Sequence, residues 1–344
     1  MTIRIGFLFI ACFLFQSGNH GIAETNSENT AISENTTSII RPLTPQEKSA
    51  KAQEILGKKR HVDPYTVSLF EERTYHITSG KYKGSAIEYR LFSPKKIDPK
   101  KKYPLILWLH GGGETGNDNI RQLSFLRHDI LENQKEPFFI LAPQLTPPIK
   151  NWIANFADKG KPPEDMLSIV ISITSNIIHS EPIDPERVSI FGFGGGGAAA
   201  QTAAARRPDL FAAIVSCGAR IIKDEELLES LSNVPAWFFH CSKDKYIRVN
   251  QIQTGLKKLG SYAHLTTYPY KGHNAWSHAL VNDDALTWLA KQRKGEEPSW
   301  ESKGPSKILW LLKEAGARFS ALTVFVVLCI FLWRSYRPKK PAYS

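Results

Sequence analysis

Residues 188–197 read Val-Ser-Ile-Phe-Gly-Phe-Gly-Gly-Gly-Gly, an apolar run that leads directly into a glycine-rich turn. A near-continuous apolar run of this length is typical of a central strand in a parallel sheet, because such a strand is covered on both faces. A helical stretch at 197–206 follows the glycines. The segment therefore predicts a strand, a tight turn and a helix, which form the repeating unit of an α/β fold.

The same alternation continues along the chain from about residue 65. It predicts a mostly parallel sheet of eight strands with helices on both faces. The first two strands are more polar and are joined by a glycine-bounded loop at 80–84, which predicts an antiparallel hairpin at one edge of the sheet. The strands are expected at 68–77, 84–93, 104–109, 138–142, 187–191, 211–216, 235–240 and 264–269. The helices are expected at 120–133, 164–179, 197–206, 224–231, 250–260 and 275–292.

The glycine-rich turn has the spacing of a nucleophile elbow, in which the pattern G-x-S-x-G places a serine on a strained turn. Gly192 and Gly196 supply the two outer glycines, but the central position is Gly194, which has no side chain. The alternative is a dinucleotide-binding G-x-G-x-x-G formed by Gly192, Gly194 and Gly197. We disfavour it because the motif lies late in the chain and no acid ends the following strand.

A second glycine cluster follows the strand at 104–109. Glycines at this position let backbone N–H groups turn toward a bound oxygen, as an oxyanion hole requires. We expect Gly112 and Gly113 to form such a hole together with Gly195 of the elbow.

Asp244 and His273 each follow a predicted strand, and both lie after the glycine-rich turn in the chain. The order of elbow, acid and histidine is that of the α/β-hydrolases. The two side chains are therefore candidates for an acid–histidine pair. The sequence has no metal-ligand spacing, and we expect no metal or organic cofactor.

Over residues 68–292 these motifs resemble those of predicted peptidases and polyhydroxybutyrate-depolymerase-like esterases, a prolyl-oligopeptidase-type branch of the α/β-hydrolases. The segments that carry the resemblance are Tyr103–Asn119, Ala142–Gln144 with Trp152, Ile183–Val188, Pro208–Ala213, His240, Asp244 and Gly272-His273 with Trp276. The resemblance implies an esterase or peptidase with Asp244 and His273 in its catalytic triad.

The chain departs from this pattern where the family elbow reads G-x-S-M-G-G, because Gly194 and Gly195 stand in place of serine and methionine. Two smaller departures are Cys241, where the family has glycine, and Arg248, where proline is common. Acyl transfer by this route needs an oxygen nucleophile that the histidine can deprotonate. Ser216 and Cys217 are poor substitutes because they end another strand.

Two hypotheses of function follow. The first is a pseudoenzyme that binds a small ester- or peptide-like ligand, or a protein partner, without turnover. The second is an active ester or peptide hydrolase in which His273 and Asp244 activate water beside the 110–114 loop. A purely structural role does not explain why the acid and the histidine are present.

The two ends of the chain predict export and membrane anchoring. Residues 1–23 have the positive, apolar and small-residue order of a signal peptide, although an uncleaved anchor or a lipoprotein signal through Cys12 are alternatives. Residues 316–333 predict a transmembrane helix, with a buried amphipathic helix as the alternative, and 334–344 a basic cytoplasmic tail. Between them we expect a polar leader with a short helix at 24–64, the α/β-hydrolase domain at 65–293 and a linker and juxtamembrane segment at 294–315. The domain would then lie on the non-cytoplasmic side.

The net charge of +11 belongs largely to these ends. Arg4 contributes one positive charge and residues 318–344 contribute five, which leaves +5 for residues 24–317. So small an excess does not favour nucleic acid binding. The body contains only Cys217 and Cys241, and we expect buried free thiols rather than a disulfide.

Overall fold

The computed structural model describes residues 62–134, 136–153, 165–281, 283–298 and 300. The predicted signal peptide, the predicted short helix of the leader, the transmembrane helix and the basic tail lie outside the described residues. No helix within the described ranges is long and apolar enough to cross a membrane.

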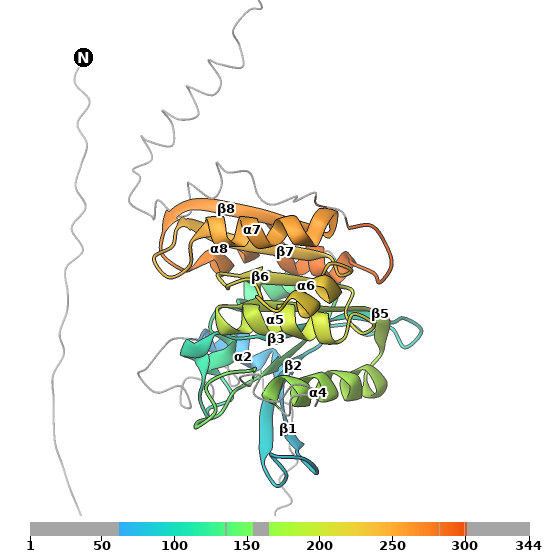
Figure 1. The fold of residues 1–344 in the computed structure, drawn as a ribbon. Helices are drawn as coiled ribbons and strands as arrows, with labels where there is room; N and C mark the ends of the chain where they lie inside the picture. Colours follow the sequence, from blue (N-terminus) through green and yellow to red (C-terminus); the bar gives the residue numbers. More distant parts are fainter. Residues whose placement is uncertain (1–61, 135, 154–164, 282, 299, 301–344) are drawn as a thin grey trace, which may run out of the picture. The chain divides into compact units, whose positions relative to one another are not determined.

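The fold is built on one eight-stranded sheet with the order β1-β2-β4-β3-β5-β6-β7-β8 (Figure 1). β1 pairs antiparallel with β2, and β2 with β4, while all other neighbours are parallel. The predicted mostly parallel sheet and its edge hairpin are confirmed. The strands are β1 Phe70–His76, β2 Ala86–Phe92, β3 Tyr103–Leu109, β4 Phe139–Pro143, β5 Ile183–Phe193, β6 Ala213–Cys217, β7 Ala236–Lys243 and β8 Ala263–Lys271.

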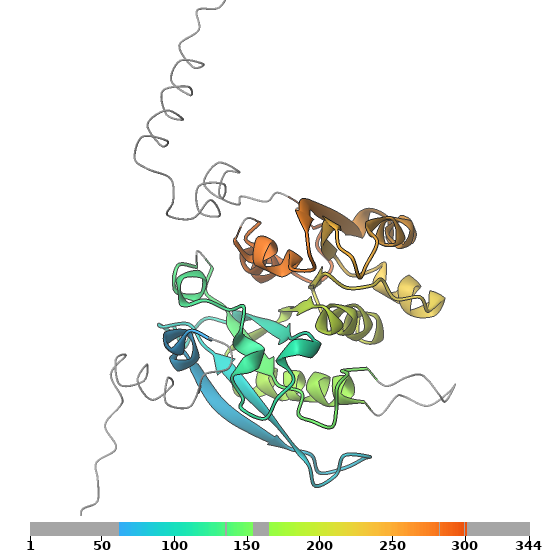
Figure 2. The same ribbon diagram turned by 90° about the vertical axis from the view of Figure 1, so that its left-hand side faces the viewer.

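Helices cover both faces of the sheet, as Figures 1 and 2 show from two directions. Leu105 and Leu107 of β3 join the core beneath α4 to α7, whereas Ile106 and Trp108 join the core beneath α2, α3, α8 and α9. Successive side chains of a strand point to opposite faces, so a strand that is apolar throughout contributes to both cores. The helices are α2 Pro64–Ser68, α3 His128–Glu132, α4 Met166–Ser180, α5 Gly195–Arg206, α6 Glu225–Leu231, α7 Val249–Leu259, α8 Ala275–Val281 and α9 Ala285–Lys291. Three 3₁₀ turns lie at η1 Gly112–Glu114, η2 Arg121–Leu123 and η3 Gly260–Tyr262.

The helix predicted over 120–133 is wrong, because only η2 and α3 form there. Side chains from the sheet take up the carbonyl groups that a helix would need. Arg90 Nε donates to the carbonyl of Asn119 at 2.8 Å, and Trp108 Nε1 donates to the carbonyl of Gln122 at 2.8 Å. Asp118 Oδ1 accepts from the backbone of Ile120 at 3.0 Å and fixes a tight turn instead.

The helix predicted over 275–292 is two helices, α8 and α9. Asp284 adopts a left-handed conformation with φ 48°, which a continuous helix does not allow. The carboxylate of Asp283 accepts a hydrogen bond from the hydroxyl of Tyr268 at 2.5 Å, which ties the break to β8. The pattern of apolar residues is the same in one helix or two, so it did not reveal this bend.

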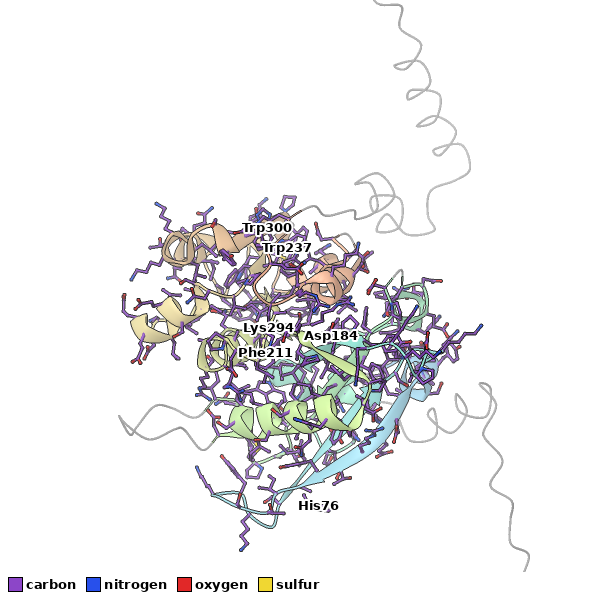
Figure 3. All side chains as sticks on the ribbon, turned by 90° about the vertical axis from the view of Figure 1, so that its right-hand side faces the viewer. His76, Asp184, Phe211, Trp237, Lys294 and Trp300 are labelled. Atoms are coloured by element: carbon purple, nitrogen blue, oxygen red, sulfur yellow. The ribbon has the colours of Figure 1, made fainter. Side chains whose placement is uncertain are left out.

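The chain beyond α9 stays attached to the domain at the start of the predicted linker. Arg293 forms an ion pair with Asp184 at 2.6 Å, and Lys294 donates to the carbonyl of Asp209 at 2.8 Å. Trp300 stacks on Trp288, with ring centroids 5.4 Å apart, and lies close to the labelled Trp237 in Figure 3. Residues 293–300 therefore include anchored side chains as well as polar linker sequence.

Candidate active site

Gly194 lies at the turn between β5 and α5, with φ 56° and ψ −120°. Its N–H donates to the carbonyl of Cys217 at 2.9 Å, and its carbonyl accepts from the N–H of Gly197 at 3.1 Å. A positive φ of this kind strains a residue that carries a side chain but not a glycine. The backbone thus makes the sharp strand-to-helix turn that the sequence pattern predicts.

Gly192 and Gly196 allow α5 to approach the sheet closely. A Cβ atom on Gly192 would lie 2.1 Å from the carbonyl oxygen of Gly196. A Cβ atom on Gly196 would lie 2.0 Å from the carbonyl oxygen of Leu109, at the end of β3. Neither residue lines the pocket at the turn; their role here is to let the helix begin directly above two strand ends.

Asp244 and His273 meet at the carboxyl ends of β7 and β8. Asp244 Oδ2 lies 2.6 Å from Nδ1 of His273, and its other oxygen accepts from the backbone N–H groups of Tyr246 at 2.7 Å and Ile247 at 3.2 Å. The Asp244 side chain is 1% exposed and that of His273 is 28% exposed. A carboxylate held in this way fixes the histidine ring with Nδ1 protonated and Nε2 turned outward.

Nε2 of His273 is directed toward Gly194. A Cβ atom built on Gly194 would lie 4.0 Å from this nitrogen and 3.7 Å from Cα of Gly111, with nothing closer. A serine hydroxyl, one bond further out, would come within the reach of about 2.6–3.2 Å that a nucleophile and its base require. The structure therefore brings the three predicted positions 194, 244 and 273 together.

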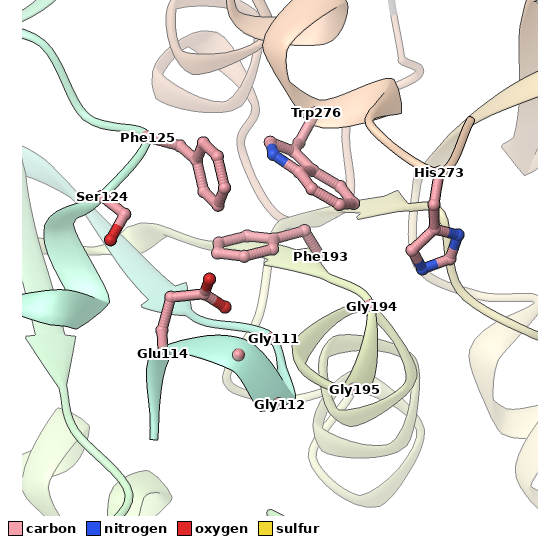
Figure 4. A pocket seen from close by; sticks show the side chains of 11 residues that line it. Gly111, Gly112, Glu114, Ser124, Phe125, Phe193, Gly194, Gly195, His273 and Trp276 are labelled. Atoms are coloured by element: carbon pink, nitrogen blue, oxygen red, sulfur yellow. The ribbon is translucent and has the colours of Figure 1, made fainter. Parts of the chain in front are cut away.

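A pocket of about 570 Å³ opens beside this turn (Figure 4). Gly112 and Gly113 from the loop after β3 line one side, and Gly194 and Gly195 line another. Gly195 is the first residue of α5, so its N–H has no acceptor within the helix. The three glycines predicted for an oxyanion hole all line the same pocket as His273.

Sequence reasoning missed the aromatic wall of this pocket. Phe193, Phe125 and Trp276 contact one another, with ring centroids 5.1–5.2 Å apart. Trp276 also meets the ring of His273 edge to face at 5.6 Å. Trp276 belongs to the motif that includes Gly272-His273 and lies at the start of α8, whereas Phe125 lies in the segment wrongly predicted as a helix.

The pocket also contains two polar residues for which the motifs predict no role, Glu114 of the 110–114 loop and Ser124. Glu114 is 6% exposed, and Ser124 donates to the carbonyl of Arg121 at 2.5 Å. In Figure 4 both lie on the opposite side of Phe193 from His273. The pocket therefore has a polar region at each end and aromatic rings between them.

Two buried histidines, His110 and His240, lie close to the residues of the site. His110 accepts from the N–H of Leu145 at 3.0 Å, and its Nδ1 donates to the carbonyl of Gly111 at 2.6 Å, which fixes the glycine loop. Burial lowers the pKa of His110 to about 4, so the ring is neutral at physiological pH. His240, on β7 near the acid–histidine pair, is also fully buried, and burial lowers its pKa to about 4.

Cys217 and Cys241 are free and buried, which confirms the prediction of free thiols. Burial raises the pKa of both thiols and keeps them protonated. Ser216 donates to the carbonyl of Gly197 at 3.1 Å and is fully buried, so its hydroxyl does not reach the pocket. Within the described ranges, no group of His, Cys, Asp or Glu side chains has the arrangement of a metal site.

Known proteins share the fold of this chain. Residues 152–291 match the family model of phospholipases and carboxylesterases. The structure of a thermostable esterase is 32% identical with a TM-score of 0.58, and the match covers 66% of this chain and 64% of that esterase. The chain thus spans less than two thirds of the length of this relative.

Two further structures share the fold at lower identity. A ferulic acid esterase is 18% identical with a TM-score of 0.51, over 64% of this chain and 98% of its own. The fluorophosphonate-binding serine hydrolase F of Staphylococcus aureus is 14% identical with a TM-score of 0.50, over 65% of this chain and 99% of its own. No curated protein matches the sequence. The chain therefore has the α/β-hydrolase fold, and its structural relatives are esterases and serine hydrolases.

Proposed function

We propose that this chain is a hydrolase-shaped binding protein without normal serine-nucleophile turnover. The observation that carries the proposal is Gly194, which occupies the turn between β5 and α5 opposite Nε2 of His273 and offers no oxygen. Acyl transfer by a triad begins with attack by that oxygen. In a serine protease, loss of the nucleophile lowers kcat by about 10⁶, while binding and the oxyanion hole retain about 10³–10⁴ over water.

The test is to supply the missing oxygen. The variant Gly194→Ser places a hydroxyl within reach of His273 Nε2, and we expect it to react with a labelled fluorophosphonate while the parent protein does not. Gly194→Ala is the matched control, because it introduces the same backbone strain without a hydroxyl. Labelling of the parent protein, or no labelling of a folded Gly194→Ser variant, would contradict the proposal.

A second candidate function is hydrolysis with water as the nucleophile, and the intact contact between Asp244 and His273 favours it. His273 Nε2 would take a proton from a water molecule over Gly194 while the oxygen attacks the ester carbonyl. The N–H groups of Gly112 and Gly195 would stabilise the oxyanion, and the proton would then pass to the leaving alcohol. This function requires that p-nitrophenyl ester hydrolysis by the parent protein is lost in His273→Ala.

We also propose that the domain is exported and anchored, on the basis of the apolar segments at 1–23 and 316–333. The excess of Arg and Lys after the second segment favours a cytoplasmic tail. Protease treatment of intact cells or spheroplasts tests this topology. An epitope placed after residue 344 should be protected while the α/β domain is digested, and the reverse pattern would refute the proposed orientation.

A further inference from the structure

The space above Gly194 lies between two kinds of hydrogen-bonding group. On one side is Nε2 of His273, at 4.0 Å from the position that a Cβ would take, and on the other are Gly112, in the loop after β3, and Gly195, the first residue of α5. In a serine hydrolase this volume belongs to the nucleophile. Here it is open to a ligand atom of the size of an oxygen.

We propose that the pocket binds a free monocarboxylic acid, with one carboxylate oxygen in the space above Gly194 against His273 and the other against the glycine N–H groups. This inference rests on the proposed function, since it treats the site as one that binds rather than turns over. It names the ligand as the acid that hydrolysis of an ester would release, not the ester itself.

The charges around His273 favour an anion only when the ring is protonated. Asp244 is buried, and two backbone N–H groups together with His273 stabilise its negative charge. A protonated ring neutralises that charge and presents an N–H to the ligand, whereas a neutral ring presents a lone pair that repels a carboxylate. Binding of a carboxylate at this position therefore requires the protonated ring.

The other groups that face His273 do not replace this role. His240 interacts electrostatically with Asp244 and His273 and is neutral near pH 7, and Tyr246 meets the His273 ring edge to face at 5.4 Å. The ammonium of Lys245 lies over the Tyr246 ring at 4.8 Å. Glu114 lines the pocket from η1, and its carboxylate is separated from His273 by Phe193 in Figure 4.

The walls of the pocket define the rest of the ligand. Phe125, Phe193 and Trp276 form an apolar surface that suits an aromatic or short aliphatic body. A volume of about 570 Å³ fits a small molecule of this kind. Glu114 Oε2 lies 3.1 Å from the position of a Cβ on Gly111, so its carboxylate borders the glycine loop, and it disfavours a second carboxylate because like charges in a partly desolvated site repel each other. A dicarboxylate long enough to reach it should therefore bind less well than the monocarboxylate.

The experiment is isothermal titration calorimetry of the full-length protein in lipid nanodiscs, with empty nanodiscs as the blank. The probes are 3-phenylpropanoate, its methyl ester, 3-phenylpropan-1-ol and 4-(2-carboxyethyl)benzoate. We expect the acid to bind at least tenfold more tightly than the other three.

Two variants locate the site. Gly194→Ser fills the space with a hydroxyl that bonds to His273, and His273→Gln removes the protonated ring; each should weaken acid binding at least tenfold. Lys100→Ala, an exposed change in the loop before β3 and outside the pocket, should leave it unchanged. Equal binding of acid and ester, absence of acid binding, or unchanged binding in folded His273→Gln would each overturn the inference.

Ester turnover in the same samples separates the two proposals. If the parent protein hydrolyses the methyl ester and also binds the acid tightly, the proposed loss of turnover is wrong while the carboxylate site stands. If it shows neither turnover nor acid binding, only the carboxylate inference fails.

Discussion

Replacement of Gly196 by alanine tests whether α5 must lie as close to the sheet as the structure has it. The new Cβ would be 2.0 Å from the carbonyl oxygen of Leu109 and 2.6 Å from that of His110, and neither is a flexible side-chain end. The helix and β3 must therefore separate. Overpacking of a rigid core costs about 1–3 kcal/mol and sometimes more. Because both neighbours are backbone, we expect at least about 3 kcal/mol, at the upper end of this range.

For a domain of this size each kcal/mol lowers Tm by about 2–4 °C, so Gly196→Ala should lower Tm by about 6–12 °C. Circular dichroism at 222 nm during heating measures the change. Gly195→Ala is the matched control on the same helix, because a Cβ there meets nothing within 4 Å. Its Tm should stay within about 2 °C of the parent, since alanine is also the better helix former. A Gly196→Ala variant that melts with the parent protein would refute the close approach of α5 to β3.

Three further predictions concern buried ionisable side chains. Because His110 and His240 have pKa values lowered to about 4 in the folded state, the unfolded chain binds more protons between about pH 4 and 6.5. As the pH is lowered from about 6.5 to about 4, the unfolding free energy should therefore decrease by about 3 kcal/mol per histidine, and it should level off below pH 4. Urea titrations at several pH values measure this change. Arg206 forms an ion pair at 3.0 Å with Asp165, whose side chain is 2% exposed. Arg206→Ala should lower the unfolding free energy by about 3–5 kcal/mol in urea titrations, because it leaves a buried carboxylate without its partner. A loss below about 1 kcal/mol would count against a buried pair. When it is combined with Gly194→Ser, Asp244→Asn should slow fluorophosphonate labelling by about 10⁴, because His273 loses its correct tautomer. An unchanged labelling rate would mean that Asp244 does not orient His273.

The sheet could be predicted from the sequence because its strands are apolar on both faces. Runs such as Leu105–Leu109 leave no alternative to burial, and they lie within β3 as expected. The glycine spacing predicted a tight turn, because glycine tolerates φ 56° at position 194 without strain. At these positions the residue types alone were sufficient to predict the strand and the turn.

The missed features depend on contacts between distant segments. The predicted helix at 120–133 fails because Arg90 and Trp108, on two strands of the sheet, take its carbonyl groups. The aromatic wall of the pocket needs Phe125 and Trp276 to meet across about 150 residues of chain, which no local pattern encodes. The acid–histidine pair was predictable because both residues follow strands, and parallel strands end on one edge of the sheet.

The type of residue at position 194 affects both the chemistry of the turn and the fraction of molecules that are folded. A residue with a side chain at φ 56° and ψ −120° costs about 1–3 kcal/mol, which glycine does not incur. Since a change of 1–2 kcal/mol alters the ratio of folded to unfolded molecules about five- to thirtyfold, this glycine reduces the unfolded population that proteases can attack. Gly194→Ser would therefore add a hydroxyl group and lower the protein's resistance to proteolysis in a single substitution, so one change at this position alters both properties.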